Sequence, residues 1–167
     1  MVKGIKYLHN CGVVHGDIKG VRPLTLSKDS VAKLPPTQHN ILISDSTPSF
    51  ALLADFGFTR VTTVSVRASS GEPGTLLFMA PELLLPNKFG LDKGVPSREA
   101  DVYTLGMAVY QVLTSELPFF PRREAEITHA VTSGQRPPKP ENAEEIGITE
   151  ALWDLLHQEI YRSADHA

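Results

Sequence analysis

One long apolar segment constrains the fold of this chain more than any other feature. From Ser97, a suitable N-cap, apolar side chains recur at helical spacing as far as Leu113. The segment contains enough Leu, Met, Ala and Val for a helix that is buried on most of its sides. Other elements must therefore surround it. With 41% hydrophobic residues among 167, the chain has enough apolar material for such a core.

The rest of the chain predicts further amphipathic helices. Their expected ranges are 1–10, 125–133 and 149–161, and Gly134 should end the second of them. The expected apolar faces consist of Val2, Ile5 and Leu8 in the first helix and of Leu152, Leu155, Leu156 and Ile160 in the last.

Little β-structure is expected. Two short apolar runs, 41–43 and 50–53, predict a β-hairpin with a long connection. Residues 22–39 are rich in proline without any periodicity, and residues 59–74 are rich in Ser, Thr, Arg and Gly, so both segments predict loops. The expected fold class is therefore mainly α, with a small antiparallel strand element.

Composition and charge exclude several classes of function. The net charge of −3 offers no general electrostatic attraction to nucleic acid or to a membrane surface. No apolar run is long enough to span a bilayer, and the N-terminal residues lack the extended apolar stretch of a signal peptide. Cys11 is the sole cysteine, which excludes an intrachain disulfide and favours a reducing, cytoplasmic location.

Four short motifs follow one another in a fixed order. They are His15-Gly16-Asp17, Asp55-Phe56-Gly57, Ala80-Pro81-Glu82 and Asp101-Val102-Tyr103-Thr104-Leu105-Gly106. Each motif alone is a weak signal, since a tripeptide of this kind often marks only a turn. In this order they resemble the signature set of the protein kinases over nearly the whole chain. The resemblance implies the helical C-terminal lobe of an α+β parent fold.

The resemblance also implies roles in phosphoryl transfer. This reaction needs a carboxylate that orients the attacking hydroxyl, and hard oxygen ligands for Mg²⁺. Asp17 would be the catalytic base, and Lys19 would neutralise charge on the transferred group. Asn40 and Asp55 would bind Mg²⁺, and Thr75 would hydrogen-bond to Asp17 and Lys19 beside the substrate. The implied cofactors are ATP and Mg²⁺, the implied partner is a protein substrate, and Lys19 and Thr75 are typical of serine/threonine kinases.

Other interpretations of these residues remain open. Asp17 could be a turn aspartate, Lys19 a solvated surface charge, and Asn40 the end of a loop. His15-Gly16-Asp17 is also found in small-molecule phosphotransferases of the aminoglycoside and choline kinase type. Those enzymes lack the Ala-Pro-Glu motif and the central helix, which favours a protein kinase. The segments HGDIKG, DVYTLG and GQRPPKP are similar to the tyrosine kinase-like branch, fungal members included.

Two acidic residues are expected to be structural. In the family, Asp101 braces the catalytic loop through backbone N–H groups, which suits an acid near a helix N-terminus. Glu82 pairs in the family with an arginine that we expect beyond the last residue here. Arg162 is a candidate substitute within the chain.

Two parts that the family uses to hold ATP are missing from the sequence. They are the Gly-rich phosphate loop and the strand lysine that pairs with a helix glutamate. We therefore expect the N-terminal lobe to be absent, with residues 1–167 forming a partial kinase domain that binds ATP weakly. The rival interpretation is a non-catalytic kinase-like fragment, or pseudokinase, that binds partners. The sequence makes no prediction of the oligomeric state.

Residues 22–39 depart from the family inside the catalytic loop. The family places four residues between the aspartate and the asparagine, whereas Asp17 and Asn40 lie much further apart. Deletion of 22–39 restores the family spacing. Because Val21-Arg22 can be encoded by a splice-donor sequence, our hypothesis is a translated, retained intron. The alternative is a genuine looped-out insertion.

Overall fold

The central helix dominates the fold of the computed structural model, which describes residues 2–23, 40–44, 46–48, 50–57, 59–61 and 75–162. Helix α4 spans Arg98–Thr114, and the Ser97 hydroxyl accepts a hydrogen bond from the backbone N–H of Ala100 (3.0 Å). Residues 103–108 are all buried. The predicted cap is therefore confirmed, and the predicted burial is confirmed between Ala100 and Tyr110.

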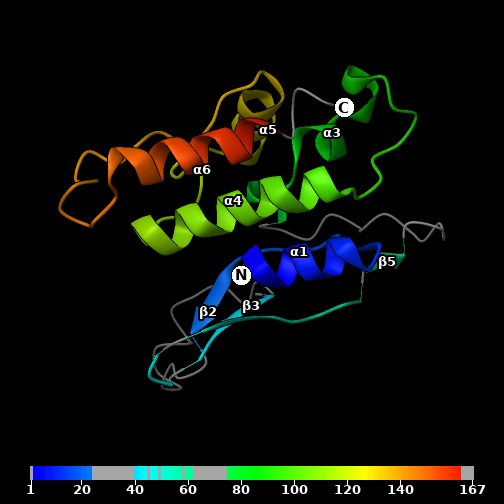
Figure 1. Ribbon diagram of the computed structural model, residues 1–167. Helices are drawn as coiled ribbons and strands as arrows, with labels where there is room; N and C mark the ends of the chain where they lie inside the picture. Colours follow the sequence, from blue (N-terminus) through cyan, green and yellow to red (C-terminus); the bar gives the residue numbers. More distant parts are fainter. Residues whose placement is uncertain are drawn as a thin grey trace.

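Two helices pack on one side of α4. Helix α6 (Glu150–Arg162) lies along α4 in Figure 1, with the Trp153 ring 6.4 Å from that of Tyr110. Leu156 is buried, but Leu155 is 56% exposed. The predicted apolar face is thus wrong at Leu155, because consecutive helical positions differ by about 100° and only one of the two can face α4. Helix α5 spans Glu124–Thr132.

On the other side of α4 lies α1 (Val2–Asn10), between α4 and the strands (Figure 1). Its His9 contacts Asp101 of α4, and Gly4 lies close to Leu53 of strand β4 (Ala51–Leu53). Ile5 is buried as predicted, but Val2 is 67% exposed. The prediction is wrong at Val2, which lies in the first turn of the helix and away from the core.

The strands form two small sheets. Strands β3 (Ile41–Ile43) and β4 (Ala51–Leu53) pair antiparallel, which confirms the predicted hairpin. Strand β2 (Val21–Pro23) pairs parallel with β3. Strand β1 (Val13–Val14) pairs antiparallel with β5 (Arg60–Val61).

Two of the predicted loops therefore begin in β-structure. The loop prediction is wrong at residues 22–23 and 60–61. Proline signals in a sequence suggest a loop, but an edge strand such as β2 tolerates proline because one side of its backbone needs no ladder partner. Residues 24–39 and 62–74 lie outside the described residues.

Short helical turns connect the strands to the large helices. They are η1 (Thr75–Leu77), α3 (Pro81–Leu84) and η2 (Pro86–Phe89). The core draws on nearly every element, with Ile5, Ile18, Ile41, Phe78, Tyr103, Met107 and Ile127 among its buried members. Among the described helices, none is long and apolar enough to cross a membrane. The expected mainly helical class with a small antiparallel element is confirmed.

Candidate active site

Asp17 and Lys19 form a buried ion pair in the segment that follows β1. The Lys19 Nζ atom lies 3.2 Å from Asp17 Oδ2, and the two side chains are only 8% and 2% exposed. Lys19 is therefore not a solvated surface charge. An ammonium group and a carboxylate that lie this close together can both contact one bound molecule.

Asn40 joins this pair from the far end of the long segment. Its Nδ2 atom donates to the backbone oxygen of Asp17 and to Asp17 Oδ2, the latter at 3.0 Å. Its backbone N–H donates to the Lys19 carbonyl at 2.9 Å. Asp17, Lys19 and Asn40 together are called the Asp17 corner below. Asp17 and Asn40 are 23 positions apart, yet the chain leaves this corner and returns to it. The extra residues therefore do not separate the two side chains.

Asp55 lies next to this group, just after β4. The N–H of the preceding residue, Ala54, donates to the Asn40 carbonyl at 2.8 Å. The Ala54 carbonyl lies 3.2 Å from Nε2 of His15. Asp55 itself is exposed, has a φ of 59°, and accepts a hydrogen bond from the Gly57 N–H (3.2 Å). The backbone that leads into Asp55 is thus tied to Asn40.

Asp101 fixes the backbone that leads into Asp17. Its Oδ2 accepts from the His15 N–H and its Oδ1 from the Gly16 N–H, both at 2.8 Å. The expected brace between the central helix and the loop is present. A third contact, from Nε2 of His9 at 2.9 Å, was missed from the sequence, where His9 was only one of several polar residues on the first helix.

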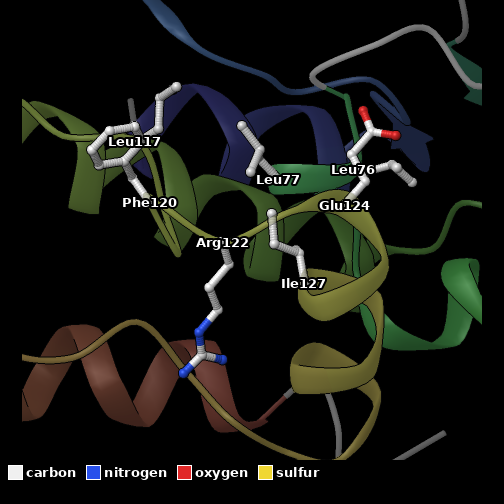
Figure 2. A pocket seen from close by; sticks show the side chains of 7 residues that line it. All are labelled: Leu76, Leu77, Leu117, Phe120, Arg122, Glu124 and Ile127. Carbon is white, nitrogen blue, oxygen red and sulfur yellow. The ribbon is translucent and has the colours of Figure 1, made fainter.

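Thr75 is placed only by its backbone, at the start of η1. Its side chain lies outside what the structure describes, so the predicted hydrogen bonds to Asp17 and Lys19 stay predictions. Next to it is a pocket of about 180 Å³ (Figure 2). Its lining consists of Leu76, Leu77, Leu117, Phe120, Arg122, Glu124 and Ile127. In Figure 2 the Arg122 guanidinium points away from the apolar side chains, so the pocket is mainly apolar.

Glu82 has an unusual environment. It is 3% exposed, and within the described part of the chain neither carboxylate oxygen has a hydrogen-bond partner. Burial raises the pKa of Glu82 above its usual value and Glu99 adds to the rise, whereas the residue's own backbone N–H and the Arg136 guanidinium oppose it. Arg136 Cζ lies 5.2 Å from the centre of the Tyr103 ring. Sequence reasoning considered Arg162, whose side chain lies outside the described residues, and missed Arg136.

The donor set of the Asp17 corner fits a magnesium nucleotide. Protein Mg²⁺ sites typically use one or two carboxylates and complete the shell with phosphate and water oxygens. The Asp55 carboxylate and the Asn40 amide oxygen are ligands of this kind. In the described ranges, no three His, Cys, Asp or Glu side chains form a closed metal cage.

Comparison with known proteins decides the family. A family model described as "Protein kinase domain" matches residues 37–162, well over half of the chain. The chain belongs to the protein kinase domain family. The matched range includes Asn40, Asp55, Thr75 and the Ala-Pro-Glu motif, and it begins inside the segment 22–39. The alternative of a small-molecule phosphotransferase is thereby set aside.

Individual relatives agree with this family. The chain is 28% identical to "Serine/threonine-protein kinase RUNKEL" of Arabidopsis thaliana, with 91% of the chain and 9% of that protein aligned. It is 32% identical to "Serine/threonine-protein kinase ELM1" of Saccharomyces cerevisiae, covering 78% of the chain and 19% of that protein. It is 29% identical to "Serine/threonine/tyrosine-protein kinase HT1" of Arabidopsis thaliana, covering 83% and 28%. The chain thus spans less than a third of each of these relatives.

Proposed function

We propose that this chain carries the catalytic face of a serine/threonine protein kinase that uses Mg²⁺ and ATP. The observation that carries the proposal is the contact of Asn40 with Asp17 and Lys19 across 23 positions of sequence. The long segment between Lys19 and Asn40 would allow their side chains to separate. Both side chains nevertheless contact the Asp17 carboxylate. Their contact preserves a group that can orient a hydroxyl and hold a phosphoryl group.

Each residue then has a stated role. Asp17, held by Asn40 and Lys19, would orient the substrate hydroxyl and accept its proton. Lys19 would stabilise negative charge on the transferred group. Asn40 and Asp55 would hold Mg²⁺. When bound, Mg²⁺ and ATP would supply the phosphoryl group and neutralise its charge. Thr75 would lie beside the hydroxyl-bearing residue of the substrate.

The apolar pocket beside Thr75 supports a protein rather than a small substrate. It is open beside η1 and offers mainly Leu, Ile and Phe side chains (Figure 2). We propose that an apolar side chain of the protein substrate enters it, near the phosphorylated residue. Burial of one such side chain contributes about 1.5–3 kcal/mol, less the cost of ordering the peptide.

We also propose that the 167 residues alone transfer phosphate poorly, since their sequence contains no Gly-rich loop to position the phosphates. The second candidate is a non-catalytic kinase-like module. The observation that favours it is the insertion within the catalytic loop itself. A cytoplasmic location remains a prediction in either case.

A phosphoryl-transfer assay tests the proposal. The chain is joined behind the N-terminal lobe of a related kinase and incubated with a mixture of protein substrates and γ-labelled Mg·ATP. We expect label on Ser or Thr, and Asp17→Asn should reduce turnover by about 10²–10⁴-fold because the hydroxyl loses its base. The exposed Asp154 on α6 provides the matched control, Asp154→Asn, which should not change turnover. Nucleotide binding without any transfer would favour the second candidate. Equal turnover in wild type and Asp17→Asn would contradict the assigned role.

A further inference from the structure

Glu124 places a carboxylate at the apolar pocket of Figure 2. It is the first residue of α5, it is exposed, and it lines the pocket together with Leu76 and Ile127. Within the part of the chain that the structure describes, its carboxylate has no hydrogen-bond or ion-pair partner. By contrast, Glu126 in the same turn of α5 accepts a hydrogen bond from the Arg123 N–H (3.1 Å). The Glu124 carboxylate is therefore available to a ligand in the pocket.

The basic residue of the pocket lining does not pair with this carboxylate. Arg122 donates from Nη1 to Gln135 Oε1 at 2.8 Å, and its guanidinium carbon lies 5.9 Å from the centre of the Phe119 ring. In Figure 2 the Arg122 guanidinium and the Glu124 carboxylate point in opposite directions. The pocket thus has an acidic end beside Leu76, which a basic group of a ligand can approach.

The other end of the pocket is an apolar wall held by a tight turn. Phe119 has a φ of 64°, which is an outlier for a bulky residue, and it is 3% exposed. The next residue, Phe120, is 69% exposed and lines the pocket with Leu117. The Phe120 N–H donates to the Leu117 carbonyl (3.1 Å), and the Arg122 N–H donates to the Phe119 carbonyl (2.9 Å). Backbone strain of this kind is concentrated at ligand sites, and an exposed ring in a fixed turn favours an apolar group of a ligand.

We propose that Glu124 selects protein substrates that carry a lysine or arginine next to the apolar side chain that enters the pocket. The basic residue pairs with the Glu124 carboxylate, while the apolar side chain contacts Ile127 and Phe120. Because Leu76 directly follows Thr75, the selected residues lie near the phosphorylated Ser or Thr. The inference rests on the proposed function and adds a charge requirement to the apolar one. Since exposed ion pairs are weak, the selection is graded rather than absolute.

Peptide binding to the whole chain, measured by fluorescence anisotropy at low salt and without nucleotide, tests the charge requirement. Three labelled peptide pools share a fixed Ser and a Leu at a varied distance from it, and they carry Arg, Gln or Glu next to the Leu. We expect the wild type to bind the Arg pool about two- to fivefold more tightly than the Gln pool, the range of an exposed ion pair. Glu124→Gln should bind these two pools equally, and Glu124→Arg should prefer the Glu pool. The control is Glu144→Arg, at an exposed acid outside the pocket, which should keep the wild-type preference.

Two results would overturn the inference. The first is a wild type that binds no pool or binds the Arg and Gln pools equally, and the second is an Arg preference that the Glu124 substitutions leave unchanged. If Glu124→Arg does not fold, Glu124→Gln and the salt dependence decide, because an ion-pair preference must shrink as the ionic strength rises. Phosphoryl transfer separates this inference from the proposed function. Equal transfer to the Arg and Glu pools would contradict only the selection by Glu124, whereas charge-selective binding without any transfer would contradict only the proposed function.

Discussion

Asp101 and Glu82 are two buried carboxylates with opposite surroundings. Each lies in the first turn of its helix, α4 or α3, and their exposed fractions are 2% and 3%. Asp101 accepts hydrogen bonds from three donors. Neither carboxylate oxygen of Glu82 has a hydrogen-bond partner among the other residues that the structure describes. Equal burial therefore goes with two different hydrogen-bonding environments in one domain.

The difference shows what decides the outcome of burying an acid. Donors offset the loss of hydration at Asp101, so its side chain organises the loop that contains Asp17. At Glu82 the loss of hydration dominates and raises the pKa of the carboxyl group. Arg136, which lies over the Tyr103 ring, opposes this only in part. Asp101 therefore holds the backbone before Asp17, whereas we expect Glu82 to make the stability depend on pH.

Removal of the Asp101 carboxylate should have the larger effect. Asp101→Ala leaves the His15 and Gly16 amides and the His9 ring without their acceptor, so the free energy of unfolding should fall by about 3–5 kcal/mol. Urea denaturation measures it. Asp154→Ala, on the exposed face of α6, is the control and should change stability by less than about 0.5 kcal/mol. If Asp101→Ala lowers the free energy of unfolding no more than the control does, the hydrogen bonds to Asp101 do not stabilise the fold.

Substitution of Glu82 should change the free energy of unfolding by less than substitution of Asp101. It should increase this free energy, by an amount that depends on pH. The native pKa is raised above the usual 4.5, so the native state binds more protons than the unfolded state at pH values between 4.5 and the native pKa. The free energy of unfolding of the wild type should therefore fall as pH rises through the native pKa. Glu82→Gln cannot titrate and should escape this loss.

The comparison of Glu82→Gln with wild type by thermal unfolding, from acidic to neutral pH, checks this prediction. The variant should gain stability relative to wild type as the pH rises. Glu144→Gln, an exposed substitution, should show no such trend. A constant difference across the pH range would mean that Glu82 has a charged partner and that its contrast with Asp101 does not exist.

The helical framework could be predicted from sequence because its signals are local. Ser97, the apolar run that follows it and the short runs of the hairpin each act through neighbouring residues. The family motifs then indicated that Asp17, Lys19 and Asn40 belong together. The pairing of β2 with β3 could not be predicted, since it depends on which segments the fold brings side by side.

The contacts of His9 and Arg136 escaped sequence reasoning for the same physical reason. His9 reaches Asp101 across 92 positions, and Arg136 reaches the Tyr103 ring from the connection between α5 and α6. His9 carries no periodic or motif signal, and the family-like segment GQRPPKP contains Arg136 without showing what that residue contacts. The contacts of such polar residues are set by tertiary packing, so a sequence pattern does not identify them.

The central claim is that Asp17 and Asn40 form one group despite the segment between them. A double-mutant cycle on stability tests it most directly, with Asp17→Ala, Asn40→Ala and the double variant measured by urea denaturation. Side chains in contact couple by about 0.5–3 kcal/mol, whereas independent ones add within about 0.3–0.5 kcal/mol. Because Asn40 Nδ2 donates to Asp17 Oδ2, we predict a coupling of at least about 1 kcal/mol. Additive effects of the two substitutions would contradict the account.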